Sequence, residues 1–227
     1  MTENAAAQAS LAPAFRVCYN KSDRSGAPPS RRKRWNQGER KMDFKEIMAD
    51  CPVIAAVKDM DELEQCLKAD IKVVFILFGT VCSIPRIVER VKETGRYAMV
   101  HLDLITGLSA KEASVDFIRE YTKADGIIST KQPIIARAAE LGFCTVQRFF
   151  VIDSMALSNV TRRHDSCHPD FIEILPGVMP KIIRRICRET QTPIIAGGLI
   201  ADKEDIMAAL GAGACAISTT NPSVWFM

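Results

Sequence analysis

Eight short apolar runs recur between residues 53 and 220, and most of the stretches between them have the punctuation of helices. The runs are continuously apolar rather than alternating, which is typical of parallel strands that are buried on both faces. Strands that alternate with helices in this number predict a small (β/α)8 barrel, the TIM-barrel fold. The eight runs are Val53–Val57, Val73–Leu77, Ala98–Leu102, Gly126–Ile128, Phe143–Val146, Phe171–Ile174, Pro193–Gly198 and Cys215–Thr220.

Local signals place several of the helices between these strands. The sequence from Ser109 to Glu112 has the pattern of a capping box and predicts a helix start. Pro133 and Pro180 stand where first-turn prolines belong, and Gly95 and Gly142 stand where helices should end. The predicted helices therefore fit between the predicted strands.

The sequence also predicts one helix before the first strand and one after the last strand. Residues 44–50 predict an extra helix that closes the bottom of the barrel, and the end of the chain at Met227 predicts a very short last helix. A doubly wound open sheet would also alternate strands and helices. It usually has fewer strands, however, and it carries a glycine fingerprint after the first strand, where this chain has Val57 and Lys58.

Composition limits the class of protein. Of 227 residues, 48% are hydrophobic and 25% are charged, which fits one globular domain with a full core. No apolar run approaches the roughly 18 residues of a membrane-spanning helix, and no secretory signal is present, so no membrane partner is expected. The eight cysteines are scattered, and Cys144 and Cys215 lie inside predicted strands. This usage is typical of reduced thiols and predicts a cytoplasmic protein.

Basic charge is concentrated in residues 1–41, which hold nine Lys or Arg against three acids, whereas residues 42–227 hold 21 against 24. The first segment has little apolar pattern and predicts a disordered basic extension to a barrel domain of residues 42–227. Its run Arg31–Trp35 could bind nucleic acid through phosphate contacts and stacking. Alternatively, the extension is dispensable, or the start codon was assigned too early, since Met42 directly precedes the first residues expected to fold.

Candidate ligand-binding residues stand at the carboxyl ends of the predicted strands, where barrel chemistry takes place. The loops after strands seven and eight commonly bind phosphate esters, and glycines there let backbone N–H groups approach the anion. The candidates are Lys58, Asp103, Arg148, Glu173, Gly197, Gly198, Ser218, Thr219 and Thr220.

The four charged candidates allow two interpretations. Lys58 and Arg148 would bring cations to the barrel mouth, where an unpaired cation is costly unless an anion accompanies it. Asp103 and Glu173 could supply that anion and close a salt-bridge network without any ligand. The convergence of four charged groups and a glycine pair on one face favours ligand binding.

No motif specifies a reaction, and we predict no catalytic residue. A phosphate pocket with a lysine and two carboxylates could support proton abstraction or aldol chemistry, so a phosphate-ester-metabolising TIM-barrel enzyme is the alternative. His101 lies inside the third strand and is interpreted as a buried histidine with a hydrogen-bond partner. The cluster from His164 to His168 has close spacing in a polar stretch and is interpreted as a solvated helix end. We therefore predict neither a metal site nor a cofactor.

Matching stretches run in order through almost all of residues 42–227. They are Pro52–Asp59, Phe75–Gly79, Val100–Leu108, Ala124–Lys131, Gln147–Phe150, Ile172–Gly177, Ile194–Ile200 and Ile217–Asn221. In these stretches the chain resembles the glycerol uptake operon antiterminator family, the glycerol-3-phosphate-responsive regulators of bacterial glycerol genes.

The resemblance implies a regulator of transcription antitermination rather than an enzyme. Its effector would be glycerol 3-phosphate, and its RNA partner the leader mRNA of the glycerol uptake and metabolism operon. On barrel geometry we expect Gly197, Gly198 and Ser218–Thr220 to hold the phosphate. Lys58 and Arg148 would supply charge, and Asp103 and Glu173 would bind the two glycerol hydroxyls.

The RNA-binding surface has no recognised motif, because the chain lacks the RNP aromatic motif and the GXXG clamp of KH domains. Basic residues on one predicted helix, or Arg162 and Arg163 on another, could contact RNA, although a charged outer face is common on barrel helices. A homo-oligomer would double such a patch and raise avidity. A sensor that acts through a protein partner is a third hypothesis. The RNA-binding candidates on the first of these helices are Lys181, Arg184, Arg185 and Arg188.

Overall fold

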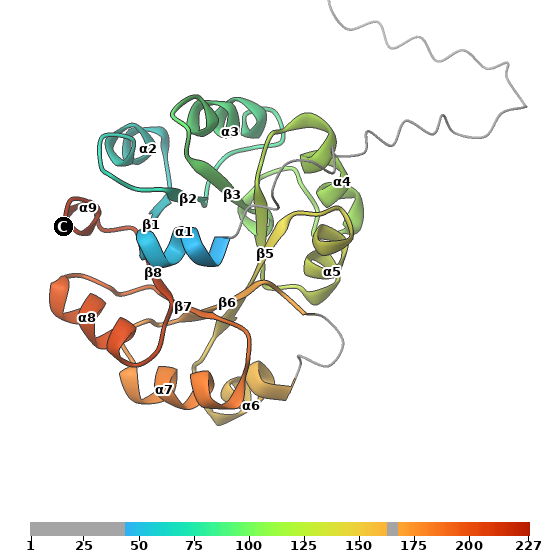
Figure 1. The fold of residues 1–227 in the computed structure, drawn as a ribbon. Coiled ribbons are helices and arrows are strands. Elements are labelled where there is room, and N and C mark those ends of the chain that lie inside the picture. Colours follow the sequence, from blue (N-terminus) through green and yellow to red (C-terminus); the bar gives the residue numbers. More distant parts are fainter. Residues whose placement is uncertain (1–43, 163–167) are drawn as a thin grey trace, which may run out of the picture. The chain divides into compact units, whose positions relative to one another are not determined.

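The computed structural model describes residues 44–162 and 168–227. In these residues eight parallel strands close into a barrel in the order β1 to β8 (Figure 1). Each predicted apolar run overlaps one of them, which confirms the TIM-barrel prediction. The strands are β1 (Val53–Val57), β2 (Val73–Ile76), β3 (Tyr97–His101), β4 (Gly126–Ser129), β5 (Cys144–Phe150), β6 (Phe171–Leu175), β7 (Ile194–Gly197) and β8 (Ala216–Thr219).

Helices surround the barrel in Figure 1, and a 3-10 turn, η1 (Leu102–Leu104), follows β3 directly. None of the helices in the described part of the chain is long and apolar enough to cross a membrane. The α-helices are α1 (Phe44–Asp50), α2 (Met60–Cys66), α3 (Ile84–Glu93), α4 (Glu112–Tyr121), α5 (Gln132–Glu140), α6 (Ser154–Arg162), α7 (Pro180–Glu189), α8 (Lys203–Gly211) and α9 (Pro222–Trp225).

The two end helices were predicted correctly. Helix α1 lies across one end of the barrel in Figure 1, and Met48 of this helix is fully buried in the cluster of side chains that fills the barrel interior. Phe44 and Ile47 pack against the same cluster. The last helix, α9, has only four residues.

Proline and glycine signals mark the helix ends as predicted. Helices α5 and α7 begin with a proline in their first turn. Gly95 and Gly142 follow α3 and α5 with φ angles of 76° and 79°, which residues with a side chain rarely adopt.

The capping-box prediction at Ser109 was wrong. Helix α4 begins at Glu112, and the residue before it, Lys111, has extended backbone and no side-chain cap. Because the chain is extended at Lys111, the helix starts too late for the side chain of Ser109 to act as its N-cap. The carbonyl oxygen of Ser109 instead accepts a hydrogen bond from Ser114 Oγ at 2.6 Å.

The core has three parts. One fills the barrel interior with inward side chains such as Phe75, Met99 and Phe171. The other two lie where the strands pack against helices, one with Ile87 of α3 and one with Ile183 of α7 as members. Strands that are buried on both faces explain why the apolar runs are continuous rather than alternating.

The cysteines of the described residues form no disulfide. Cys144 is buried in β5 as predicted, whereas Cys215 is half-buried and lies one residue before β8. Cys18 and Cys167 lie outside the described residues, as do the basic extension of residues 1–41 and most of the His164 to His168 cluster.

Candidate functional site

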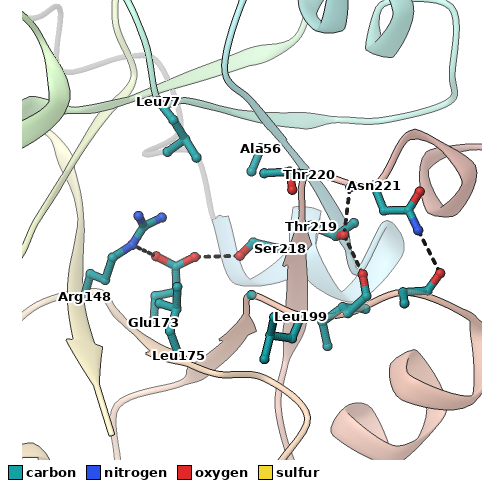
Figure 2. A pocket seen from close by; sticks show the side chains of 13 residues that line it. Ala56, Leu77, Arg148, Glu173, Leu175, Leu199, Ser218, Thr219, Thr220 and Asn221 are labelled. Atoms are coloured by element: carbon teal, nitrogen blue, oxygen red, sulfur yellow. Dashed lines mark hydrogen bonds and ion pairs between the residues drawn. The ribbon is translucent and has the colours of Figure 1, made fainter. Parts of the chain in front are cut away.

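A cavity of about 380 Å³ opens at the carboxyl ends of the strands, next to the loops that follow β7 and β8 (Figure 2). Its volume lies in the range of small-molecule sites. Six of the nine candidate residues from the sequence are among the residues that line it. The lining consists of Ala56, Leu77, Arg148, Glu173, Leu175, Gly198, Leu199, Ile200, Ala201, Ser218, Thr219, Thr220 and Asn221.

A buried chain of three hydrogen-bonded polar side chains lines one part of this cavity. The carboxylate of Glu173 accepts a hydrogen bond from Arg148 Nε at 2.5 Å and one from Ser218 Oγ at 2.6 Å (Figure 2). Glu173 is fully buried and Arg148 is 7% exposed. The three residues lie on β5, β6 and β8, so the closure of the barrel brings them together.

Gly197 is a glycine because this polar chain leaves no room for a side chain. A Cβ atom at this position would lie 2.6 Å from both Glu173 Oε1 and Ser218 Oγ. Its contribution to the site is therefore close packing against the buried carboxylate. Gly197 does not line the cavity itself.

The next two residues turn the backbone at the cavity wall. Gly198 and Leu199 have φ angles of 75° and 62°, and Leu199 is the one residue other than glycine with positive φ in the described part of the chain. Strained backbone of this kind concentrates at ligand sites. The side chain of Leu199 is 74% exposed, so its own burial does not explain the conformation.

Two hydroxyl groups at the end of β8 are engaged in hydrogen bonds, and the hydroxyl of the residue after the strand is not. Ser218 donates to Glu173, and Thr219 Oγ1 donates to the carbonyl oxygen of Ile200 at 2.9 Å. Asn221 Nδ2 donates to the carbonyl oxygen of Ala201 at 2.8 Å and ties the same two loops together. Among the described residues, no hydrogen bond engages the hydroxyl of Thr220, so this hydroxyl is available to a ligand.

Several hydrogen-bond donors at the cavity lack an acceptor among the described residues. The two terminal nitrogens of Arg148 point away from Glu173 in Figure 2 and form no hydrogen bond with those residues. The same holds for the backbone N–H groups of Leu199, Ile200 and Thr220. A cavity with convergent donors and a buried guanidinium suits an anionic ligand.

Lys58 does not line the cavity. It is exposed, and its Nζ lies 3.1 Å from Glu62 Oε1, one turn into α2. Ala56, two residues earlier on the same side of β1, does line the cavity.

Asp103 lies in η1, also outside the lining. Its carboxylate accepts hydrogen bonds from Ser129 Oγ, from the backbone N–H of Thr130 and from Thr130 Oγ1, each at 2.8 Å. Burial acts to raise the pKa of Asp103, but these hydrogen bonds outweigh it and lower the pKa below its ordinary value.

His101 is the polar residue whose environment the sequence did not indicate. It is buried, as predicted, with 2% exposure, but its Nδ1 has no hydrogen-bond partner among the described residues. The apolar lining residues Leu77, Leu175 and Leu199 were also missed. Alternation along the strands places Leu77, Leu175 and His101 inward, and this signal could have identified them.

The four RNA-binding candidates lie on the outer side of α7, where all are exposed. Arg185 Nε binds Glu189 Oε1 at 2.9 Å, whereas Lys181, Arg184 and Arg188 form no ion pair with the described residues. Arg163 lies outside the described part of the chain. No group of three metal-binding side chains that could hold an ion occurs in residues 44–162 and 168–227.

Comparison with known proteins identifies the family. A family model described as glycerol-3-phosphate responsive antiterminator matches residues 53–225. The protein YgcP of Escherichia coli K12, which is described as uncharacterized, is 41% identical over 179 residues that cover 79% of this chain and 94% of YgcP.

Two solved structures agree with this match. A glycerol uptake operon antiterminator regulatory protein from Listeria monocytogenes is 30% identical with a TM-score of 0.75, over 78% of this chain and 95% of that one. A glycerol uptake operon antiterminator-related protein from Thermotoga maritima is also 30% identical. Its TM-score is 0.68, over 77% of this chain and 98% of that one. More distant enzymes such as orotidine 5′-phosphate decarboxylase from Pyrococcus horikoshii, at 18% identity and a TM-score of 0.58, share the fold alone. The chain therefore belongs to the glycerol-3-phosphate responsive antiterminator family, a family of regulators rather than enzymes.

Proposed function

We propose that this protein binds glycerol 3-phosphate in the cavity at the barrel mouth and, with the ligand bound, acts as an antiterminator on the leader mRNA of a glycerol operon. The description of its family supports the choice of effector. The observation that carries the ligand part is Arg148, a buried arginine whose terminal nitrogens face the cavity without an acceptor among the described residues. A buried guanidinium with open donors favours an anionic ligand.

The phosphate would lie against the loops after β7 and β8. Thr220 offers a hydroxyl there, and Leu199, Ile200 and Thr220 offer backbone N–H groups. Donors of this kind bind phosphate esters in barrels of this fold. Gly198 keeps the wall of this subsite free of a side chain.

We propose that Lys58 supplies the positive charge that balances the phosphate. Arg148 and Glu173 neutralise each other, so the phosphate needs a further cation. The pair of Lys58 with Glu62 is exposed and therefore weak, and we propose that Lys58 turns to the phosphate when the ligand enters.

The two carboxylates stay our candidates for the glycerol hydroxyls. Both oxygens of Asp103 and of Glu173 already accept hydrogen bonds from the protein. Asp103 Oδ1 and both oxygens of Glu173 accept one hydrogen bond each, so each of them has a second lone pair that can accept from a ligand hydroxyl.

Calorimetry with glycerol 3-phosphate, run beside an assay for its turnover, tests the ligand part. We expect saturable binding without turnover. Absence of binding would contradict the proposed effector, and turnover would favour a phosphate-ester-metabolising enzyme.

The RNA surface that we propose is the outer side of α7, with Lys181, Arg184, Arg185 and Arg188. Three of the four have no acidic partner among the described residues. Arg184→Glu should weaken leader-RNA binding in a gel shift. The slope of log affinity against log salt concentration should become smaller by about one unit, because one phosphate contact is lost, and smaller still because the new carboxylate repels the RNA.

Arg86→Glu is the matched control, because Arg86 is also exposed and lies on α3, across the barrel from α7 in Figure 1. Equal losses in both variants would argue against a surface on α7. RNA binding that does not depend on ligand, or its absence with ligand present, would favour a sensor that acts through a protein partner.

The same gel shift on residues 42–227 tests the basic extension. We propose that residues 42–227 suffice for RNA binding. Loss of binding without residues 1–41 would make the extension part of the RNA site. Action on a leader transcript also implies a cytoplasmic protein, and a homo-oligomer would present the α7 surface more than once.

A further inference from the structure

His101 faces the barrel interior at the end of β3. Met99, two residues earlier, belongs to the inner cluster, and Tyr97, four residues earlier, packs against it. Strand alternation gives His101 the same direction. The register pairs Phe75 with Met99 and Ile76 with Val100. Continued by one residue, it places His101 beside Leu77, which lines the cavity.

The position of β3 in the barrel sets His101 apart from the loops assigned to the phosphate. In a closed barrel of eight strands in sequential order, β3 lies opposite β7. His101 and the glycine loop after β7 therefore stand on opposite sides of the barrel, with the cavity between Leu77 and Gly198. Arg148, whose charge acts on His101, stands on β5 between them.

The imidazole is buried in an incomplete polar environment. His101 is 2% exposed, and Nδ1 has no hydrogen-bond partner among the described residues. A buried polar atom without a partner carries a desolvation cost, and such atoms in native proteins usually have a role or a missing partner.

Electrostatics keep this imidazole neutral near pH 7. Burial, followed by the positive charge of Arg148, lowers the pKa of His101 to about 4, although Asp103 acts in the opposite direction. A neutral imidazole has one nitrogen that donates and one that accepts. It can therefore bind an uncharged hydroxyl group, whereas a phosphate would favour a charged partner.

We propose that Nδ1 of His101 forms a hydrogen bond with a hydroxyl at the end of the ligand that lies away from the phosphate. This inference rests on the proposed ligand class, a polyol phosphate. It makes His101 a specificity residue, which favours a hydroxylated chain over the phosphate group alone. Because His101 does not line the open cavity, the imidazole or Leu77 changes rotamer when the ligand enters, as side chains at binding sites commonly do.

Calorimetry with two ligands tests the inference. Glycerol 3-phosphate carries the two hydroxyls, and propyl phosphate has the same length without them. His101→Phe should weaken binding of glycerol 3-phosphate about three- to tenfold, the value of one neutral hydrogen bond, and should leave propyl phosphate within about twofold. His101→Asn places an amide near the position of Nδ1 and should retain most of the affinity for glycerol 3-phosphate.

Tyr97→Phe is the matched control, since it removes a polar group from the opposite end of the same strand and should change neither affinity. Equal weakening of both ligands by His101→Phe, or no weakening, would overturn the role of His101 and leave the proposed effector intact. If the wild-type protein binds the two ligands equally, no hydroxyl contact exists and the inference fails. If it binds neither, the proposed function fails as well.

Discussion

Arg148 donates from Nε to Glu173 at 2.5 Å, and both side chains are buried at the mouth of the barrel. The pair leaves the two terminal nitrogens of Arg148 directed at the cavity (Figure 2). The same arginine therefore neutralises a buried carboxylate and offers donors to a ligand. Substitutions can separate these two roles.

Arg148→Ala should lower the free energy of unfolding by about 3 to 5 kcal/mol, because it leaves Glu173 as a buried charge without its cation. The double variant Arg148→Met with Glu173→Gln removes both charges and should recover most of this loss. Neither variant should bind glycerol 3-phosphate with wild-type affinity. Urea denaturation and calorimetry measure the two effects.

A double variant that is stable and still binds the ligand like the wild type would remove Arg148 from the site. A double variant as unstable as Arg148→Ala would instead show that the unpaired charge of Glu173 is not the cause of the lost stability in Arg148→Ala.

Gly197→Ala should destabilise the protein by about 1 to 3 kcal/mol, the usual cost of overpacking a full core. The new Cβ would stand 2.6 Å from Glu173 Oε1 and Ser218 Oγ and would push their hydrogen bond apart. Gly211→Ala is the control, because a Cβ at this helical position meets nothing within 4 Å. The midpoint temperature of thermal unfolding should be well below that of Gly211→Ala in the Gly197→Ala variant. Equal midpoints would show that Glu173 and Ser218 move aside at little cost.

Gly198→Ala should cost stability and ligand affinity together. Its φ of 75° strains any side chain by about 1 to 2 kcal/mol, and the new Cβ borders the proposed phosphate subsite. Gly95→Ala carries the same strain at φ 76° in open space away from the cavity. Gly198→Ala should lose at least as much stability as Gly95→Ala, because its Cβ would also lie 3.2 Å from Leu175 Cδ2. Only Gly198→Ala should lose affinity in calorimetry, and full affinity in that variant would show that the phosphate lies elsewhere.

Protonation of His101 should make stability depend on pH. The pKa of this buried group is about 4, whereas its value in the unfolded chain is about 6.5. Between these values the unfolded chain binds a proton that the folded chain does not, so the free energy of unfolding falls as the pH drops through this window. It does not change from this cause above about pH 6.5.

The loss between pH about 6.5 and about 4 should reach at most about 3 kcal/mol, and His101→Asn should abolish it. Arg148 and Asp103 are the charged groups that act on His101, and both stay in place in this variant. Urea denaturation at several pH values in this window gives the comparison. If the free energy of unfolding changes with pH in the same way in the wild type and in His101→Asn, His101 does not titrate in this window.

The barrel could be predicted from the sequence because its signals are local and repeated. Apolar runs such as Val53–Val57 recur at each strand, and prolines and glycines mark the helix ends. The signal at Ser109 failed because the conformation of the following loop, with Lys111 extended, decides where a helix starts.

The site could be predicted only in outline. The sequence identified residues at the strand ends, but it could not tell which partners each would have. Ser218 and Thr219 have their hydroxyls engaged within the protein, and Lys58 and Asp103 bind neighbours outside the cavity lining. Such pairings depend on contacts between distant strands, as in the hydrogen bond of Ser218 with Glu173, and no local pattern encodes them.

A crystal structure of the protein with glycerol 3-phosphate tests the central claim most directly. We expect the phosphate against the loops after β7 and β8, within hydrogen-bond distance of Thr220 and the backbone of Leu199 or Ile200, with Arg148 in contact with the ligand. A ligand bound away from the cavity between Leu77 and Gly198, or a cavity that stays without ligand at saturating concentration, would contradict it.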